Sequence, residues 1–299
     1  RINIIFSDDV SMLGPSFTIR KFAEETISIT QLIAWGTISS QVAAYIWICL
    51  EYGMSVLVSG ETASGKTTTL NAILPFIDHN VKIYSAEDTP EVKVRHKIWQ
   101  RLVTRSSKNE ESRVEMFDLL KAALRERPEY IIVGEIRGAE AYVLFQAMAT
   151  GHCAYSTVHA DSVASLVHRL ENKPIDIPRV LLPALEACAI QIQTRINGKR
   201  VRRTKQLVEI VGIDPNSLEI ITNEVFRWDV TSDDFIFSGK SYVLEKIMVK
   251  INFSQDDMRR ELRTRKRILE WMVLNDIRKA DQVSQIVTEY YVRPNEILA

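Results

Sequence analysis

The sequence predicts an α/β fold in which a mainly parallel, twisted sheet is covered by helices. Apolar, strand-like runs alternate with helical patterns between about residues 41 and 194, and this alternation is typical of parallel strands joined by crossover helices. A glycine-rich loop also separates one expected strand from the next helix, at residues 60–67. We expect strands at residues 55–59, 81–85, 130–133, 154–158 and 189–194.

The first 35 residues predict only strand and turn pieces. Ile4 and Phe17 belong to short alternating runs on either side of Gly14-Pro15, and these runs are too few to bury a core of their own. We expect residues 1–35 to be the C-terminal remnant of an N-terminal α+β domain with its linker. Because the chain begins at Arg1 rather than at methionine, we take this position as the boundary of a fragment.

Three helical patterns separate the expected strands within residues 36–212, which we expect to form the main domain. Pro128 and Gly151 follow the second and third patterns as helix stop signals. The apolar positions at helical spacing are Leu70, Ile73, Leu74 and Ile77, then Phe117, Leu120 and Leu124, and then Ala141, Leu144, Phe145 and Met148.

A β-hairpin and a helical tail are predicted toward the C-terminus. Apolar runs at 205–213 and 218–221 flank Asp214-Pro215, which favours a hairpin turn. The tail takes its apolar positions from residues 258–273. We expect residues 213–299 to form a C-terminal hairpin and helical subdomain.

Composition narrows the class of protein. Lys and Arg total 38, as do Asp and Glu, so the formal net charge is zero, which argues against a polybasic nucleic-acid-binding protein. Cys49, Cys153 and Cys188 form no CxxC pair, so we expect neither a disulfide scaffold nor a cysteine-only zinc site. The sequence lacks the run of about 20 apolar residues that a membrane span needs and a signal peptide. We expect a cytoplasmic protein without a transmembrane segment.

The strongest motif is a complete GxxxxGK[ST] pattern at residues 60–67. In a loop between a strand and a helix, the backbone N–H groups of this motif cradle nucleotide phosphates, helped by the helix dipole. Lys66 would reach the β- and γ-phosphates, and the Thr67 hydroxyl would bind Mg²⁺. The motif therefore predicts a site for ATP and Mg²⁺ formed by Gly60, Glu61, Thr62, Ala63, Ser64, Gly65, Lys66, Thr67 and Thr68.

Acidic residues follow two further expected strands. Glu87 and Asp88 end one of them and Glu135 ends another. Because ligands of α/β sheets bind outside the carboxyl ends of the strands, all three face the phosphate loop. Considered alone, any one of these acids could also be a solvent-exposed charge in a loop or the cap of a helix. In nucleotide-hydrolysing sites of this kind, an Asp at the end of this strand normally helps to bind Mg²⁺. Gly134 occupies that position here, so we expect Glu135 or Asp88 to bind the metal.

Histidine and arginine residues complete the candidate catalytic set. His152 precedes one expected strand and His159 follows it, so His159 is expected near the γ-phosphate, while His152 is equally well explained as structural. Neither has a partner at the spacing of zinc ligands. Arg137 lies just beyond Glu135, where a cation can stabilise the charge that develops on a γ-phosphate during hydrolysis.

Together these segments resemble the secretion-superfamily ATPases, which power type II secretion, type IV pilus and archaellum assembly, and type IV secretion. The family combines a phosphate loop, an acidic box, a Gly-Glu metal strand and a histidine box. They occur here in that order at residues 60–67, 83–90, 132–137 and 150–160. The similarity extends from residues 14–22 to Glu289-Tyr290-Tyr291 and is closest to the archaeal branch, through residues 61–64, 202–203 and 226–229.

This resemblance implies a RecA-like ATPase core at residues 36–212 that works in a hexameric ring. By the same likeness, Glu87 would be the general base, Glu135 would hold Mg²⁺ through water, and His159 would sense the γ-phosphate. Arg20 matches a position from which the preceding domain supplies an arginine across the nucleotide cleft. The implied partner is a polytopic membrane platform protein, with the motor peripheral at the inner face of the membrane.

Two other functions stay open at this point. One is a DNA-translocating conjugation-type ATPase of the same superfamily, and the other is a scaffold that binds nucleotide without hydrolysing it. Basic clusters at residues 195–205 and 259–267 fit contact with anionic lipid or a platform protein, but also a solvated surface paired with acids. Since no aromatic residues interleave with them, we expect no nucleic-acid partner.

Overall fold

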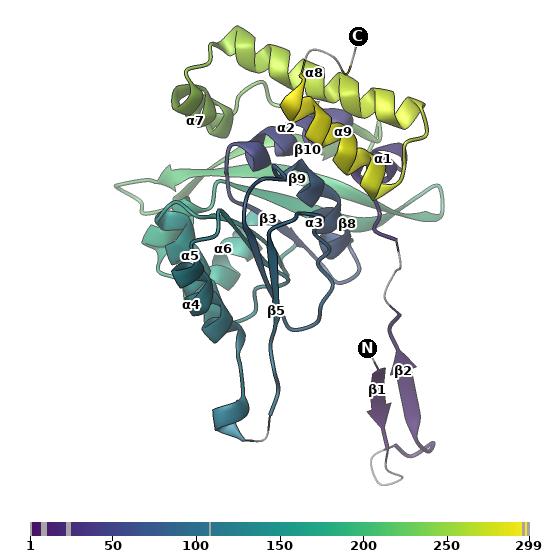
Figure 1. The fold of residues 1–299 in the computed structure, drawn as a ribbon, viewed down its shortest axis with the longest axis vertical. Helices are drawn as coiled ribbons and strands as arrows, with labels where there is room; N and C mark the ends of the chain where they lie inside the picture. Colours follow the sequence, from purple (N-terminus) through teal and green to yellow (C-terminus); the bar gives the residue numbers. More distant parts are fainter. Residues whose placement is uncertain (1, 7–10, 22–24, 108, 295–296, 298–299) are drawn as a thin grey trace.

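The computed structural model describes residues 2–6, 11–21, 25–107, 109–294 and 297. Arg1, the expected fragment boundary, and Phe22, the last residue of the family-like stretch 14–22, lie outside the described residues. Within these ranges, a sheet of nine strands has the order β11-β10-β9-β8-β3-β7-β6-β4-β5. It lies at the centre of the molecule (Figure 1). The parallel strands are β3 (Val56–Gly60), β4 (Ile83–Glu87), β5 (Trp99–Val103), β6 (Tyr130–Val133), β7 (Cys153–Val158) and β8 (Ala187–Ile196). The antiparallel extension comprises β9 (Lys199–Ile213), β10 (Ile220–Asp229) and β11 (Asp234–Phe237).

The predicted α/β class with a mainly parallel sheet is therefore confirmed. The strand β6 has the predicted bounds, and four other predicted strands are displaced by one or two residues at their ends. The edge strand β5 was not predicted, because its sequence Trp-Gln-Arg-Leu-Val lacks the continuous apolar run of a central strand.

Helices cover both faces of the sheet (Figure 1). Along β3, Val56 and Val58 belong to the core on the α2 side and Leu57 to the core on the α5 side, because successive side chains of a strand point to opposite faces. One layer contains α1 (Ile29–Ala34), α2 (Ser40–Glu51), α3 (Lys66–Ile73), η1 (Leu74–Phe76), α7 (Tyr242–Ile251), α8 (Gln255–Leu274) and α9 (Ala280–Val292). The other contains α4 (Met116–Glu126), α5 (Glu140–Ala149), α6 (Val163–Glu171) and η3 (Arg179–Ala184), while η2 (Glu110–Ser112) lies in the long β5–α4 connection.

The predicted hairpin continues the main sheet. The 15-residue strand β9 is long enough to pair with β8 along one edge and with β10 along the other. The expected boundary at residue 213 therefore runs through this hairpin. Beyond β11, helices α7, α8 and α9 form the predicted helical tail, and α8 packs against α2.

The expected remnant at 1–35 contains two kinds of structure. Strands β1 (Ile2–Ile5) and β2 (Ser16–Ile19) form an antiparallel pair that stands apart from the main body (Figure 1). Helix α1, in contrast, packs against α8 and α3 and buries Ile29 and Leu32. Among the described residues, no helix combines the length and hydropathy that a bilayer crossing requires.

Candidate functional site

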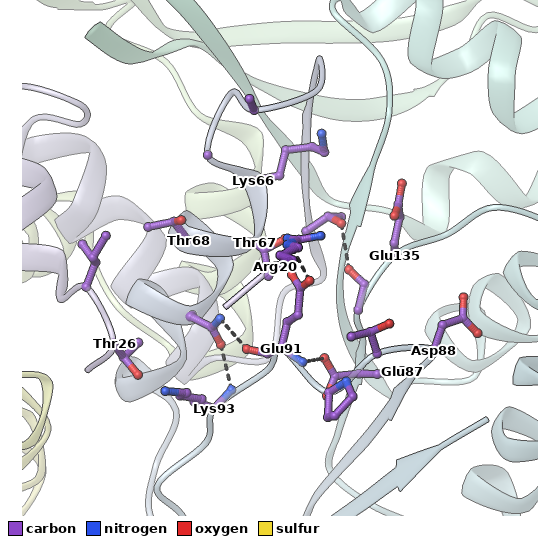
Figure 2. A pocket seen from close by; sticks show the side chains of 18 of the residues that line it. Arg20, Thr26, Lys66, Thr67, Thr68, Glu87, Asp88, Glu91, Lys93 and Glu135 are labelled. Carbon is purple, nitrogen blue, oxygen red and sulfur yellow. Dashed lines mark hydrogen bonds and ion pairs between the residues drawn. The ribbon is translucent and has the colours of Figure 1, made fainter. Parts of the chain in front are cut away.

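A cavity of about 520 Å³ opens at the carboxyl ends of β3, β4, β6 and β7. These four strands are neighbours in the sheet, so the loops that follow them meet at one edge, as expected for the ligand site of an α/β sheet. The labelled side chains of Lys66, Glu91, Glu135 and Arg20 gather around this cavity (Figure 2).

The phosphate loop forms one wall of the cavity and then starts helix α3. A Cβ atom on Gly60 would lie 2.4 Å from the Gln191 carbonyl oxygen, so the first glycine of the motif lets the loop pack against β8. The Lys66 ammonium donates a hydrogen bond of 2.8 Å to the Glu61 carbonyl. Burial lowers the pKa of Lys66, opposed by the charge of Glu135.

The predicted nucleotide-binding residues divide into two sets. Thr62, Ala63, Gly65, Lys66, Thr67 and Thr68 line the cavity. Gly60, Glu61 and Ser64 instead hold the loop together, and the Ser64 hydroxyl donates to the Glu61 carbonyl at 2.8 Å.

Glu135 is the centre of a charged cluster beside the loop. Arg137 donates to its Oε2 atom at 2.9 Å through Nε, and His159 Nε2 lies 3.3 Å from its Oε1 atom. Arg137 NH1 also lies 3.7 Å from Asp88 Oδ2. The hydrogen bond with Glu135 raises the pKa of Arg137, whereas burial and the nearby Lys66 charge lower the pKa of His159. The structure therefore brings these four predicted residues together.

Glu87 is held differently from Glu135. Its residue is 1% exposed, and its Oε1 atom accepts hydrogen bonds from the backbone N–H groups of Glu91 and Val92 at 2.8 and 2.7 Å. Its Oε2 atom is buried without a hydrogen-bond partner among the described residues, although Arg101 Nε lies 3.8 Å away. Burial raises the pKa of Glu87. A Cβ atom on Gly134 would lie 3.2 Å from Glu87 Cγ, so this glycine makes room for the acid.

Glu91 and Arg202 line the cavity but were not among the predicted site residues. Glu91 is half-buried and pairs with Arg20 NH2 at 2.8 Å. It follows Pro90, where the acidic box was taken to end. Arg202 reaches the cavity from β9, and its sequence signal was hidden within a basic cluster. His152, by contrast, lies at the other end of β7, where Thr150 Oγ1 is 3.5 Å from its Nδ1 atom.

The donor set suits Mg²⁺ shared with a nucleotide. Among the described residues, no group of three or more His, Cys, Asp or Glu side chains is arranged to hold a metal ion. Mg²⁺, however, is usually bound through one or two carboxylates, water and substrate phosphates. The Thr67 hydroxyl and the Glu135 carboxylate provide such oxygen ligands on the wall of the cavity.

The sequence has relatives in archaea and bacteria. A family model described as "Type II/IV secretion system protein" matches residues 7–225. An uncharacterized protein of Methanocaldococcus jannaschii is 53% identical over 97% of this chain and 54% of its own length. The conjugal transfer protein TrbB of Rhizobium radiobacter is 31% identical over 68% of this chain and 62% of its own length. The chain thus spans about half the length of the archaeal relative.

Solved structures support the assignment of the fold. The DotB ATPase of Legionella pneumophila aligns with a TM-score of 0.52 at 17% identity, over 96% of this chain and 71% of that one. The pilus retraction motor PilT with bound ADP aligns with a TM-score of 0.52 at 23% identity, over 72% of this chain and 60% of that one. The RecA-like ATPase fold expected from the sequence is therefore confirmed.

Proposed function

Because the chain belongs to the family of type II/IV secretion system proteins, we propose that it hydrolyses ATP with Mg²⁺ and drives a type II secretion, type IV pilus or archaellum machine. The observation that carries this proposal is one cavity lined by Lys66, Thr67, Glu91, Glu135 and His159. A phosphate-binding cation, oxygen ligands for a metal and acids able to activate water are what phosphoryl transfer to water requires.

The phosphate loop and Glu135 would organise the substrate. Backbone N–H groups of the loop and Lys66 bind the phosphates, and Thr67 and Glu135 would hold Mg²⁺. Bound Mg²⁺ supplies positive charge that offsets the charge on the phosphates. Arg137 is a positioning residue here, since its guanidinium is hydrogen-bonded to Glu135 rather than free for the phosphates. His159 lies 3.3 Å from the other Glu135 oxygen, and from there it would sense the γ-phosphate of a bound nucleotide.

We assign activation of the attacking water to Glu91. A general base must approach a water molecule to about 3 Å. The described contacts engage Glu87 Oε1 with two backbone N–H groups and bury its Oε2 atom. Both acids line the cavity, but the Glu91 side chain is 23% exposed, whereas the Glu87 side chain is 1% exposed and holds the loop that carries Glu91. The role of Glu87 as the base itself stays a prediction from the resemblance.

Nucleotide binding and turnover of purified variants test the proposal. We expect Lys66→Ala to abolish ATP binding and Glu135→Gln to retain binding while turnover falls by about 100-fold or more. Lys82→Ala and Glu126→Gln are matched controls, because these residues pair with each other away from the cavity. Undiminished phosphate release by both site variants would contradict the proposal, as would the absence of turnover in every assembly state of the unmodified protein.

The proposed working form is a hexameric ring docked on a polytopic membrane platform protein, at the cytoplasmic face of the membrane. Head-to-tail interfaces that close produce rings, and they allow one subunit to supply an arginine to the site of the next. The resemblance gives this role to Arg20, which here lines the cavity of its own subunit and pairs with Glu91 there, so that supplying the next subunit would require Arg20 to leave this pair. Sedimentation with and without ATP tests the ring; a monomer under both conditions, with full turnover, would exclude it.

A second candidate is a conjugation-type motor that moves DNA. Its support is the similarity to the conjugal transfer protein TrbB, which covers 68% of this chain. Turnover in the presence of single- and double-stranded DNA separates the candidates. Stimulation that disappears in Glu135→Gln would favour the DNA motor, and an unchanged rate would favour protein assembly or secretion.

A further inference from the structure

Arg202 extends from β9 over the phosphate loop. Its Nε atom donates a hydrogen bond of 2.8 Å to the Ala63 carbonyl, and its Cδ atom would lie 3.1 Å from a Cβ atom on Gly65. The side chain therefore runs along the outer edge of the loop. It also lines the same cavity as Lys66 and Thr67.

The strand that carries Arg202 is fixed by its neighbours. Arg203 points to the opposite side of β9, is buried, and forms a bidentate ion pair with Asp233 at 2.7 and 2.8 Å. The next residue, Thr204, accepts a hydrogen bond from the Gln191 amide on β8 at 2.9 Å. Arg202 is consequently held beside the loop by regular structure.

The contacts of Arg202 leave its charged end available. Of its three nitrogens only Nε bonds to the loop, and within the described part of the chain the two terminal nitrogens have no hydrogen-bond partner or ion pair. A guanidinium uses these terminal N–H groups to bind phosphate through charge-assisted, often bidentate hydrogen bonds. The Nε atom thus fixes the side chain on the loop, while the two terminal N–H groups remain able to bind a phosphate.

The order of the strands tells which phosphates this fork would meet. Arg202 lies on the β8–β9 side of the phosphate loop, whereas His159, Glu135 and Glu91 follow β7, β6 and β4 on the other side. The γ-phosphate must lie toward the acids that act on it. The phosphates nearer the sugar are then those closer to Arg202.

We infer that Arg202 is an additional phosphate-binding residue of the nucleotide site, and that it binds the diphosphate part common to ATP and ADP. This inference rests on the proposed function. The β8–β9 hairpin would then bind both ATP and ADP directly, together with the phosphate loop.

The decisive variant is Arg202→Gln. The glutamine amide nitrogen occupies the same place along the side chain as arginine Nε, so it keeps the donor to Ala63 and the stem over Gly65 while removing the terminal fork. We expect the dissociation constants of both ATP and ADP, measured by titration calorimetry, to rise about tenfold. Arg200→Gln is the matched control, because it removes the same charge from an exposed position on the same face of β9.

Three outcomes would overturn the inference: unchanged affinity for both nucleotides, weakening of ATP alone, or equal weakening by Arg200→Gln. In the first of these cases, weakened affinity in Arg202→Ala would show that Arg202 only holds the loop. Failure of the proposed function is distinguishable, since the unmodified protein would then bind neither nucleotide, or would bind both without releasing phosphate. Thermal unfolding of each variant confirms that the fold is intact.

Discussion

The side chain of Glu87 is accommodated because residue 134 is a glycine. The sequence interpretation treated Gly134 as the loss of an expected metal ligand, whereas the structure shows it as the space into which Glu87 packs, 3.2 Å from the position of a Cβ atom. The buried carboxylate then caps two N–H groups of the following loop. Leaving these groups unpaired in a buried site would cost on the order of 1–3 kcal/mol each.

The division of roles between Glu87 and Glu91 can be tested with two isosteric variants. We expect Glu91→Gln to lower turnover at least 100-fold with little change in melting temperature, because Glu91 lines the open cavity. Glu87→Gln should lower the melting temperature by several degrees, because a neutral amide oxygen is a weaker acceptor for the two backbone N–H groups than a carboxylate oxygen. The new amide NH₂ group would also lie at the buried Oε2 position, which has no acceptor among the described residues and lies 3.8 Å from Arg101 Nε. Phosphate release and thermal unfolding measure the two effects. Normal turnover in Glu91→Gln would return the role of base to Glu87.

At the scale of single residues, the sequence predicted what a short motif encodes. The positions of Lys66, Glu135 and His159 followed from the strands that precede them, and the structure brings all three together. Arg202 could not be found in this way, because its place depends on pairing between β8 and β9. The same holds for the pairing of Arg20 with Glu91, which joins segments more than 60 residues apart.

At the scale of elements, α8 is joined to α2 and α9 by a buried arginine. The Arg265 side chain is 1% exposed and pairs with Glu51 on α2 and Glu261 on α8. Its guanidinium also lies 5.2 and 5.4 Å from the ring centroids of Trp47 and Tyr290, within the range of cation–π attraction. One side chain thus contacts three helices.

We expect Arg265→Ala to reduce the free energy of unfolding by about 3–5 kcal/mol, because it leaves the partly buried carboxylates of Glu51 and Glu261 without their cation. Arg267→Ala on the exposed side of the same helix is the control and should change stability by less than about 0.5 kcal/mol. Urea unfolding followed by circular dichroism measures both. A loss below about 1 kcal/mol for Arg265→Ala would show that the three helices are held together by apolar packing alone.

Prediction of whole elements succeeded where the apolar pattern was strong. The buried strand β6 has four consecutive apolar residues and was placed at its observed bounds. The first part of β9 was missed, since its sequence Lys-Arg-Val-Arg-Arg-Thr has no apolar alternation and was interpreted only as part of the basic cluster at residues 195–205. Such a strand is specified by its partner β8 rather than by its own composition.

At the scale of the whole molecule, the C-terminal helix α9 packs against the segment around His79, about 200 residues earlier in the chain. His79 lies 3.0 Å from the hydroxyl oxygens of both Ser284 and Thr288, and its ring stacks on that of His96 at a centroid distance of 4.8 Å. His96 Nε2 lies 3.0 Å from the Ile77 carbonyl, to which it donates, and its Nδ1 atom is buried without a hydrogen-bond partner among the described residues. A protonated ring would place a positive charge in this buried contact beside His79, which the charge of Asp78 offsets only in part.

This arrangement predicts a loss of stability in acid. Burial, aided by the adjacent His79, lowers the pKa of His96 to about 4, compared with an ordinary value of 6.5. The unfolded chain therefore takes up a proton below about pH 6.5 while the folded protein does not. Stability from this histidine is complete above that pH, is lost as the pH falls toward 4, and amounts to on the order of 3 kcal/mol.

The variant His96→Gln isolates this effect, because its amide keeps a donor for the Ile77 carbonyl but does not titrate. Urea unfolding at pH 7, 5.5 and 4 should show the unmodified protein losing more free energy of unfolding than the variant does, by on the order of 3 kcal/mol across the range. The gap should open mainly between pH 6.5 and 4, the interval between the two pKa values of His96. Parallel pH profiles would contradict the argument and would mean that His96 is protonated in the folded protein as readily as in the unfolded chain.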